Sequence, residues 1–188
     1  MTFQSNITAE KILHKISNEN DHQSKKFARR KFGLEILILD ISKFIIIYPL
    51  SLIVGILGEM FILHMSYMLV RTYSRGGHSK KNYQCVIMSL INFILLPYFI
   101  TNVFMFPRYI LWLCSILNLF ILYFNAGTGT AKYPVTDKLQ RNIYRKKSII
   151  VNLILTAVAI IIPSLLIQNL IILGCFTAGL KTLPVYKK

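Results

Sequence analysis

The sequence predicts an all-α protein: a polytopic membrane helix bundle of about six transmembrane or partly re-entrant helices, preceded by an N-terminal amphipathic helix. Two observations carry this prediction. Hydrophobic residues make up 54% of the 188 residues and charged residues only 15%, whereas charged residues make up about a quarter of a typical soluble domain. The apolar residues also fall in long uncharged runs, which is typical of helices that cross a bilayer.

The composition excludes two other classes of protein. There are 22 Lys and Arg against 7 Asp and Glu, which gives a net charge of +15. A nucleic-acid-binding protein of this charge would not carry the apolar runs, so no nucleic acid is expected as a partner. The abundance of Ile, Leu and Phe excludes a disordered chain. The length allows one domain, which we expect over residues 33–188 after a cytoplasmic segment of residues 1–32.

The N-terminal segment predicts a helix with one apolar face. Phe3, Ile7, Ile12 and Ile16 recur at helical spacing between charged residues. Such a helix lies on the inner leaflet or docks against a partner helix, and a solvated capping helix fits the pattern equally well. No apolar core of a signal peptide is present, so we expect no cleavage.

The uncharged runs define six membrane segments. A helix across a hydrocarbon core of roughly 30 Å takes about 20 apolar residues, so the run Ser148–Leu180 is too long for one crossing. Gln168 and Asn169, shortly after Pro163, predict a turn within this run. The predicted segments are 34–55, 57–71, 84–104, 108–125, 148–167 and 169–183. The second and sixth are short, and four full spans with two shallow or re-entrant segments is the competing count.

The distribution of cations predicts the orientation of these segments. If the helices alternate in direction, the basic residues of both termini and of the loops after the second and fourth segments lie on one side. The positive-inside rule makes that side the cytoplasm. The opposite connections carry only Glu59 and Arg108. The charges therefore favour six crossings of the cell membrane, with both termini in the cytoplasm.

The cysteines and glycines do not indicate a cofactor. Cys85, Cys114 and Cys175 lack the spacing of a zinc or redox site, so no metal is expected. Cys114 and Cys175 lie in apolar segments and are interpreted as packing residues. The Gly127–Thr130 stretch lacks the Gly-Lys-Ser/Thr ending of a phosphate-binding loop, so no nucleotide is expected.

The loop between the second and third segments holds the arrangement most typical of catalysis. It begins at Arg71 and places His78 seven positions before Cys85. A cysteine nucleophile needs a base, usually a nearby histidine, and the Gly-Gly pair before His78 gives the chain freedom to fold back. If Asn82 caps the third segment, Cys85 lies in its first turn, where the helix dipole and the nearby cations favour the thiolate. A basic connecting loop without catalytic function is the alternative.

An arginine followed by Gly-x-His-x6-Cys at the entry to a membrane helix resembles the accessory gene regulator B (AgrB) family. The residues that carry the resemblance are Arg71, Gly76, His78 and Cys85. The resemblance extends over nearly the whole chain, including the basic N-terminus and the loop that contains Lys132. Relatives often have several consecutive lysines where this chain has Ala-Lys-Tyr around Lys132.

This resemblance implies a membrane-embedded cysteine endopeptidase of bacterial quorum sensing, with His78 and Cys85 as catalytic residues. It would cleave the C-terminal tail from the precursor of an autoinducing peptide through a thioester on Cys85, and support cyclisation to a thiolactone or lactone. The implied partners are an AgrD-like precursor with an amphipathic leader and an acidic tail, the lipid bilayer and a second copy in a homodimer. The candidate substrate-binding or supporting residues are Arg71, Gly76, Lys80, Lys81 and Lys132.

Two other function classes are compatible with a small polytopic protein. A transporter or exporter of peptides without protease activity would favour intramembrane charges, internal repeats and discontinuous helices. Apart from Glu59 and His64 the membrane segments are nearly free of ionisable residues, and the sequence has no internal repeat. A membrane scaffold without an active site is the third class. Reactivity of Cys85 toward thiol reagents would separate the enzyme from both.

Overall fold

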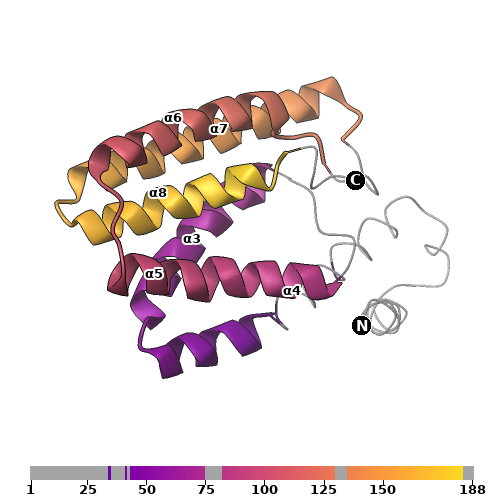
Figure 1. Ribbon diagram of the computed structural model, residues 1–188. Coiled ribbons are helices and arrows are strands. Elements are labelled where there is room, and N and C mark those ends of the chain that lie inside the picture. The colour runs from indigo at the N-terminus through magenta and orange to yellow at the C-terminus, as the bar shows by residue number, and fades with distance from the viewer. Residues whose placement is uncertain (1–33, 35–40, 42, 75–81, 130–134, 184–188) are drawn as a thin grey trace, which may run out of the picture. The chain divides into compact units, whose positions relative to one another are not determined.

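The structure, a computed structural model, describes residues 34, 41, 43–74, 82–129 and 135–183 (Figure 1). The chain divides into two compact units, residues 1–50 and 51–188. The regular structure of the described residues is helical, which confirms the all-α prediction for this part of the chain. The expected N-terminal amphipathic helix and the expected domain boundary after residue 32 lie outside the described residues.

The first described helix, Lys43–Val54, ends at a glycine as the sequence predicts. Gly55 has a φ of 78°, which costs a glycine little because it has no Cβ. Its N–H donates to Leu52 O at 3.1 Å, and the N–H of Ile56 donates to Ser51 O at 3.0 Å. This pair of hydrogen bonds is the Schellman arrangement that satisfies the last carbonyls of a helix. Helix α3 (Leu57–Ser74) begins directly after it.

The third predicted segment is one continuous helical rod with a wide turn inside it. It consists of α4 (Asn82–Leu90), the π-helical turn η2 (Ile91–Leu95) and α5 (Leu96–Asn102). Pro97 causes the irregularity, because it has no N–H to donate to the carbonyl four residues earlier and its ring would collide with that carbonyl. The N–H of Leu96 instead donates to Ile91 O, which is the i→i+5 bond of a π-helix.

Three further helices, α6 (Arg108–Asn125), α7 (Lys138–Ile161) and α8 (Leu165–Leu180), complete the described fold. Helix α7 begins ten residues before the predicted segment at 148. Its first turns are basic and exposed. The hydropathy of the sequence therefore predicted only the apolar part of the helix and not its true start. The side chain of Asp137 starts α7 by accepting a hydrogen bond from Leu139 N at 2.9 Å.

The turn predicted at Gln168 and Asn169 is wrong. The chain turns at Ile162–Ser164, around Pro163, and both amides lie inside α8 and are buried. The side chain of Gln168 donates to Ile162 O at 2.7 Å and so satisfies a carbonyl at the end of α7. The two amide side chains in this apolar run therefore form hydrogen bonds with neighbouring segments, and they do not themselves form a turn.

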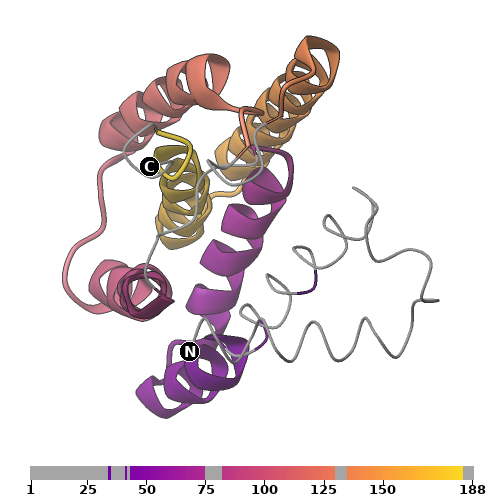
Figure 2. The same ribbon diagram turned by 90° about the vertical axis from the view of Figure 1, so that its right-hand side faces the viewer.

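Helix α8 is the centre of the bundle in the second unit. It packs against α3, α6 and α7, and it lies between α3 and the α6–α7 pair in Figure 2. Two of its glycines allow close approach. A Cβ on Gly174 would lie 2.6 Å from the backbone oxygen of Leu63 in α3, and a Cβ on Gly179 would overlap Asn118 Oδ1 of α6. Small residues at helix contacts of this kind are typical of membrane bundles.

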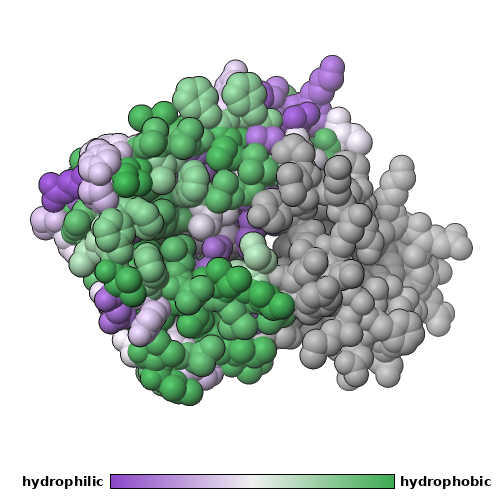
Figure 3. All heavy atoms as spheres, viewed as in Figure 1, coloured by the Kyte–Doolittle hydropathy of each residue, from purple (hydrophilic) through white to green (hydrophobic). Residues whose placement is uncertain are grey.

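The buried sides of α6 and α7 carry polar residues, and the exposed side of α6 is largely apolar. On α6, Ser115 and Asn118 are buried, whereas Leu113, Ile116 and Phe120 are exposed. On α7 the buried positions include Ser148 and Asn152. Apolar residues cover most of the described surface seen in Figure 3. A soluble helix would bury its apolar face instead.

By length and apolar composition alone, one described helix, α6, is suited to cross a membrane. The helices Lys43–Val54, Val86–Asn102 and Leu165–Leu180 are apolar but shorter. Length and composition do not separate a membrane span from the core helix of a soluble protein, so the six predicted crossings stay a prediction.

Candidate active site

The candidate site lies where α3 ends and α4 begins. The structure places Arg71 in the last turn of α3 and Cys85 in α4. The connecting residues 75–81, with Gly76, His78, Lys80 and Lys81, lie outside the described residues, as does Lys132. The approach of His78 to Cys85 therefore stays a prediction, and the structure supplies the two helix ends between which the loop runs.

Cys85 occupies the first turn of α4, as the sequence predicts. The helix begins at Asn82, one residue earlier than capping by Asn82 would give, and helix ends shift by this amount between assignments. Cys85 is the fourth residue of the helix. The first turn of a helix has backbone N–H groups without helical partners and a partial positive charge. A negative charge is in general favoured at such a helix position.

Cations of α7 and of the end of α8 lie against α3 at the same end of the bundle. The ammonium group of Lys181, at the end of α8, lies 5.2 Å from the centre of the Tyr67 ring in α3. That of Lys147 in α7 lies 6.0 Å from the Tyr73 ring, also in α3. These lysines are held against the faces of tyrosines on the helix that leads into the loop, and they add positive potential there.

The end of α3 is tied to the loop between α6 and α7. The N–H of Gly127 donates to Ser74 O, the last carbonyl of α3, at 2.9 Å. Gly127 has a φ of 78°, and a Cβ there would lie 2.6 Å from Arg141 O of α7. From the sequence, this glycine-rich stretch was predicted only not to be a phosphate-binding loop. The structure makes Gly127 a close contact between α3 and α7, and it brings the loop that continues toward Lys132 to the end of α3.

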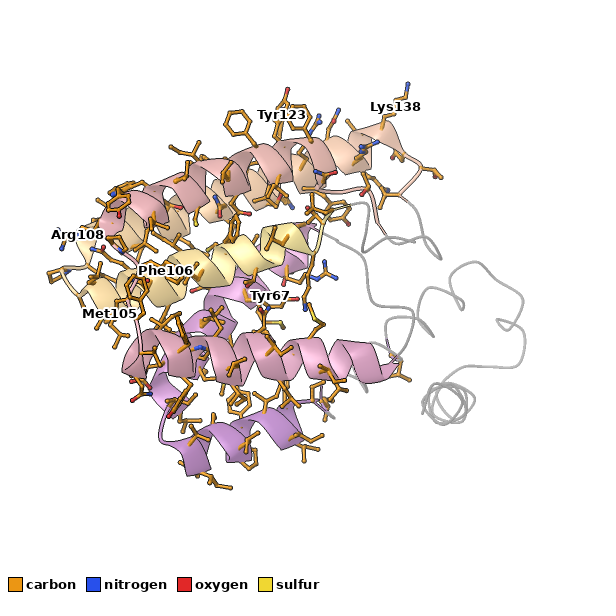
Figure 4. All side chains as sticks on the ribbon, viewed as in Figure 1. Tyr67, Met105, Phe106, Arg108, Tyr123 and Lys138 are labelled. Atoms are coloured by element: carbon orange, nitrogen blue, oxygen red, sulfur yellow. The ribbon has the colours of Figure 1, made fainter. Side chains whose placement is uncertain are left out.

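Arginine 145 adds a fixed guanidinium to this end of the bundle. It donates to Asn142 Oδ1 at 2.7 Å and to Tyr123 O at 3.4 Å, and its Cζ lies 5.2 Å from the centre of the Tyr123 ring. In Figure 4, Tyr123 and Lys138 lie toward one end of the α6–α7 pair and Arg108 lies at the other. The described cations of α7 and α8 thus lie at the end of the bundle where α3 meets its loop.

A polar cluster inside the bundle was missed by the sequence analysis. Asn118 Nδ2 donates to Asn152 Oδ1 at 2.8 Å and to Cys175 O at 3.0 Å, joining α6, α7 and α8. One turn away the hydroxyl groups of Ser115 and Thr156 lie 3.0 Å apart. The available signal was a set of Asn, Ser and Thr residues at helical spacing within apolar runs. In the described residues no three or more His, Cys, Asp or Glu side chains lie together as metal ligands would.

Comparison with known proteins gives a match over nearly the whole chain. The sequence model of the family Accessory gene regulator B matches residues 9–183. An AgrB-like protein from Listeria welshimeri is 33% identical over 150 residues, which are 79% of this chain and 72% of the relative. The accessory gene regulator protein B of Staphylococcus aureus strain JH9 is 29% identical over 173 residues, which are 91% of this chain and 90% of the relative. No solved structure matches.

Proposed function

Because the chain belongs to the accessory gene regulator B family, we propose that it is a membrane-embedded cysteine endopeptidase. Its substrate is the precursor of an autoinducing peptide of bacterial quorum sensing, AgrD-like in having an amphipathic leader and an acidic tail. Cys85 is the nucleophile and His78 the general base. The observation that carries the proposal is the position of Cys85 in the first turn of α4, after the loop that contains His78.

A bilayer around the bundle is supported by which side chains lie inside it. The buried faces of α6 and α7 carry Ser115, Asn118 and Asn152, and their exposed faces carry large aliphatic and aromatic residues. In water this arrangement would expose apolar surface and bury amides. In lipid it places polar groups where they bond to one another, and apolar groups against acyl chains. The cation-rich end then faces the cytoplasm.

The positive end of the bundle suits both the chemistry and the substrate. The dipole of α4 and the nearby cations stabilise a thiolate on Cys85 relative to the thiol. Lys147 and Lys181, which lie over tyrosines of α3, also attract an anionic peptide tail. Lys80, Lys81 and Lys132 add positive charge in the loops on this side. Electrostatic attraction of this kind raises the encounter rate with a substrate of opposite charge.

The reaction then proceeds in two acyl transfers. His78 takes the proton of Cys85, and the thiolate attacks the carbonyl at the end of the signal sequence. The C–N bond breaks, the tail leaves as an amine that receives the proton from His78, and the peptide is held as a thioester on Cys85. A thiol or hydroxyl earlier in the same peptide attacks this thioester and closes a thiolactone or lactone, returning the Cys85 thiol. The ring closes efficiently because both groups belong to one molecule, and a partly dry site limits hydrolysis.

The test is the Cys85→Ser variant, co-expressed with its precursor peptide or reconstituted with it in proteoliposomes. We expect cleavage to be lost, because a serine hydroxyl beside an imidazole evolved for a thiol is a far weaker nucleophile at neutral pH. The Cys114→Ser variant is the matched control, since Cys114 is a half-exposed cysteine in α6 away from the loop. It should cleave at the wild-type rate.

The amount of each variant in the membrane fraction is measured alongside cleavage. Retained cleavage by Cys85→Ser would overturn the proposed enzyme. If the wild-type protein itself left the precursor uncleaved and moved it across the vesicle membrane, the peptide transporter or exporter would replace the enzyme. An uncleaved precursor that stayed on the side of the vesicle membrane where it was added would favour a scaffold.

A further inference from the structure

The helix that carries Cys85 is not a uniform α-helix, and the irregularity lies between the cysteine and the packed part of the rod. The π turn η2 separates α4, which contains Cys85, from α5. The structure packs η2 and α5 against α3, and α5 also against α8. The rotation of α4 relative to α5, and with it the register of position 85, is therefore set through η2.

The extra residue of the π turn determines which face of the rod position 85 occupies. Successive residues of an α-helix are rotated by about 100°. Over the twelve residues from 85 to 97, a uniform α-helix would place the two positions about 120° apart, whereas one inserted residue brings them to within about 20°. Pro97 is buried on the side of α5 that faces the bundle. The π turn thus places position 85 on the bundle side of the rod.

A second position shows that the bundle face does continue through the turn. Ser89 in α4 is 4% exposed and therefore buried. Ser89 and Pro97 would lie about 80° apart on a uniform α-helix, but about 20° apart with the inserted residue. Phe93 lies midway between them and is also buried. Ser89, Phe93 and Pro97 therefore form one stripe, and position 85 is the next step of that stripe toward the loop.

Phe93 is the side chain that fixes this turn against α3. Its ring centre lies 4.5 Å from that of His64 and 5.1 Å from that of Tyr67, the second contact being edge to face. All three side chains are less than 8% exposed. His64 and Tyr67 are three residues apart and so present one aromatic slot on α3. The ammonium group of Lys181, the residue after α8, lies 5.2 Å from the centre of the Tyr67 ring, so the end of α8 also contacts this aromatic group.

We propose that Phe93 is a positioning residue for Cys85. In contact with His64 and Tyr67, it fixes the rotation of the π turn and thereby the face of the rod on which position 85 lies. This inference rests on the proposed function, because it assigns Phe93 a role through Cys85. It differs from a general packing role in one respect: loss of the ring should slow the chemical step more than it weakens binding of the precursor.

The test compares Phe93→Ala with Leu95→Ala in the reconstituted cleavage assay. Leu95 lies in the same π turn, but its side chain is 58% exposed, so it is the matched control for shortening a side chain there. We expect Phe93→Ala to lower kcat by about 100-fold, the scale of a misplacement of about 1 Å, while KM changes little. Leu95→Ala should keep both constants. Phe93→Tyr, which retains the ring, should recover most of kcat.

Two additional measurements make each outcome decisive. Mass spectrometry of maleimide-treated protein measures the labelling rate of Cys85 independently of activity. This rate should change in Phe93→Ala but not in Leu95→Ala. Phe93→Leu, with a smaller fall in kcat expected, replaces Phe93→Ala if the alanine variant does not accumulate. A wild-type kcat in Phe93→Ala or Phe93→Leu, or a rise in KM alone, would overturn the positioning role. Retained cleavage by Cys85→Ser would instead overturn the proposed function.

Discussion

Gly174 lies where α8 and α3 approach most closely, and this close approach depends on the missing side chain. A Cβ there would lie 2.6 Å from Leu63 O and 3.0 Å from Ser66 Cβ. A backbone oxygen inside a helix has no room to move. We expect Gly174→Ala to lower the free energy of unfolding by about 1–3 kcal/mol, as overpacking does elsewhere. Thermal unfolding of the purified protein in detergent measures the effect.

Gly58 in α3 provides the opposite case. Among the described residues, no atom outside the neighbouring backbone of α3 lies within 4 Å of a Cβ at this position, and alanine is favoured over glycine by about 0.5–1 kcal/mol in the middle of a helix and by less near its start. Gly58→Ala should therefore raise the unfolding temperature slightly while Gly174→Ala lowers it. Equal effects of the two substitutions would contradict the close packing of α3 and α8. Sequence alone did not distinguish these glycines, because the difference lies in the neighbouring helix.

The hydrogen bond between the two buried asparagines could not be predicted from the sequence. Asn118 is 1% exposed and Asn152 also 1%, and the hydrogen bond between them joins helices that are separated by a loop. A buried asparagine in an apolar run needs a hydrogen-bond partner, but the sequence of the run does not identify that partner. Cys175 was correctly interpreted as buried packing, although its carbonyl also accepts a hydrogen bond from Asn118.

At the scale of elements, Asn169 holds the connection between α5 and α6 against the start of α8. Its Oδ1 accepts from Phe106 N at 2.9 Å, and its Nδ2 donates to Phe106 O at 3.1 Å and to Leu165 O at 2.9 Å. We expect Asn169→Leu to release this connection, because the partly buried N–H and carbonyl of Phe106 lose their side-chain partner. Hydrogen exchange at the Phe106 amide should become faster, as measured by mass spectrometry on that segment.

Asn102→Leu is the control for this experiment. Asn102 is exposed and bonds only to Tyr98 O of its own helix among the interactions seen here, so exchange at Phe106 should stay as in the wild type. An unchanged exchange rate in Asn169→Leu would show that packing of Phe104 against Phe106 holds the connection instead.

The ends of helices could be predicted from the sequence where a residue's own backbone conformation ends the helix. The predictions were wrong where contacts with another helix determine the end. Gly55 ends its helix by its own left-handed conformation, and the sequence placed that break correctly. Gln168 and Asn169 resemble turn residues in isolation, yet both satisfy neighbouring turns from inside α8. Pro97 explains the π turn. The face of the rod on which position 85 lies could not be predicted from the sequence, because it depends on which side of the rod is buried. The first turn of α4 at Cys85 was predictable because the loop and the apolar run adjoin it.

At the scale of the whole molecule, the sequence predicted that the basic clusters share one side of the membrane; the described cations of α7 and of the end of α8 lie at one end of the bundle, and the side of the membrane stays a prediction. The last residue of α3 contacts the loop after α6, and Lys147 and Lys181 lie over tyrosines of α3. The charge pattern of the sequence can predict that successive helices alternate in direction, because this prediction needs only the direction of each helix. It does not reveal how deeply each helix lies in the bilayer, which depends on the depth of both ends.

The depth of α6 and α7 is therefore the feature to test across the membrane. Arg108 begins α6 and Lys138 begins α7, and both side chains are exposed. If α6 crosses the bilayer with the cation-rich end in the cytoplasm, a cysteine at position 108 faces outward and one at 138 inward. We expect Arg108→Cys to react with a membrane-impermeant maleimide on intact cells, and Lys138→Cys only after permeabilisation. The wild-type protein is the control for its native cysteines. Labelling of both variants on intact cells would place both helix ends outside and contradict the alternating arrangement from which the cytoplasmic position of Cys85 follows.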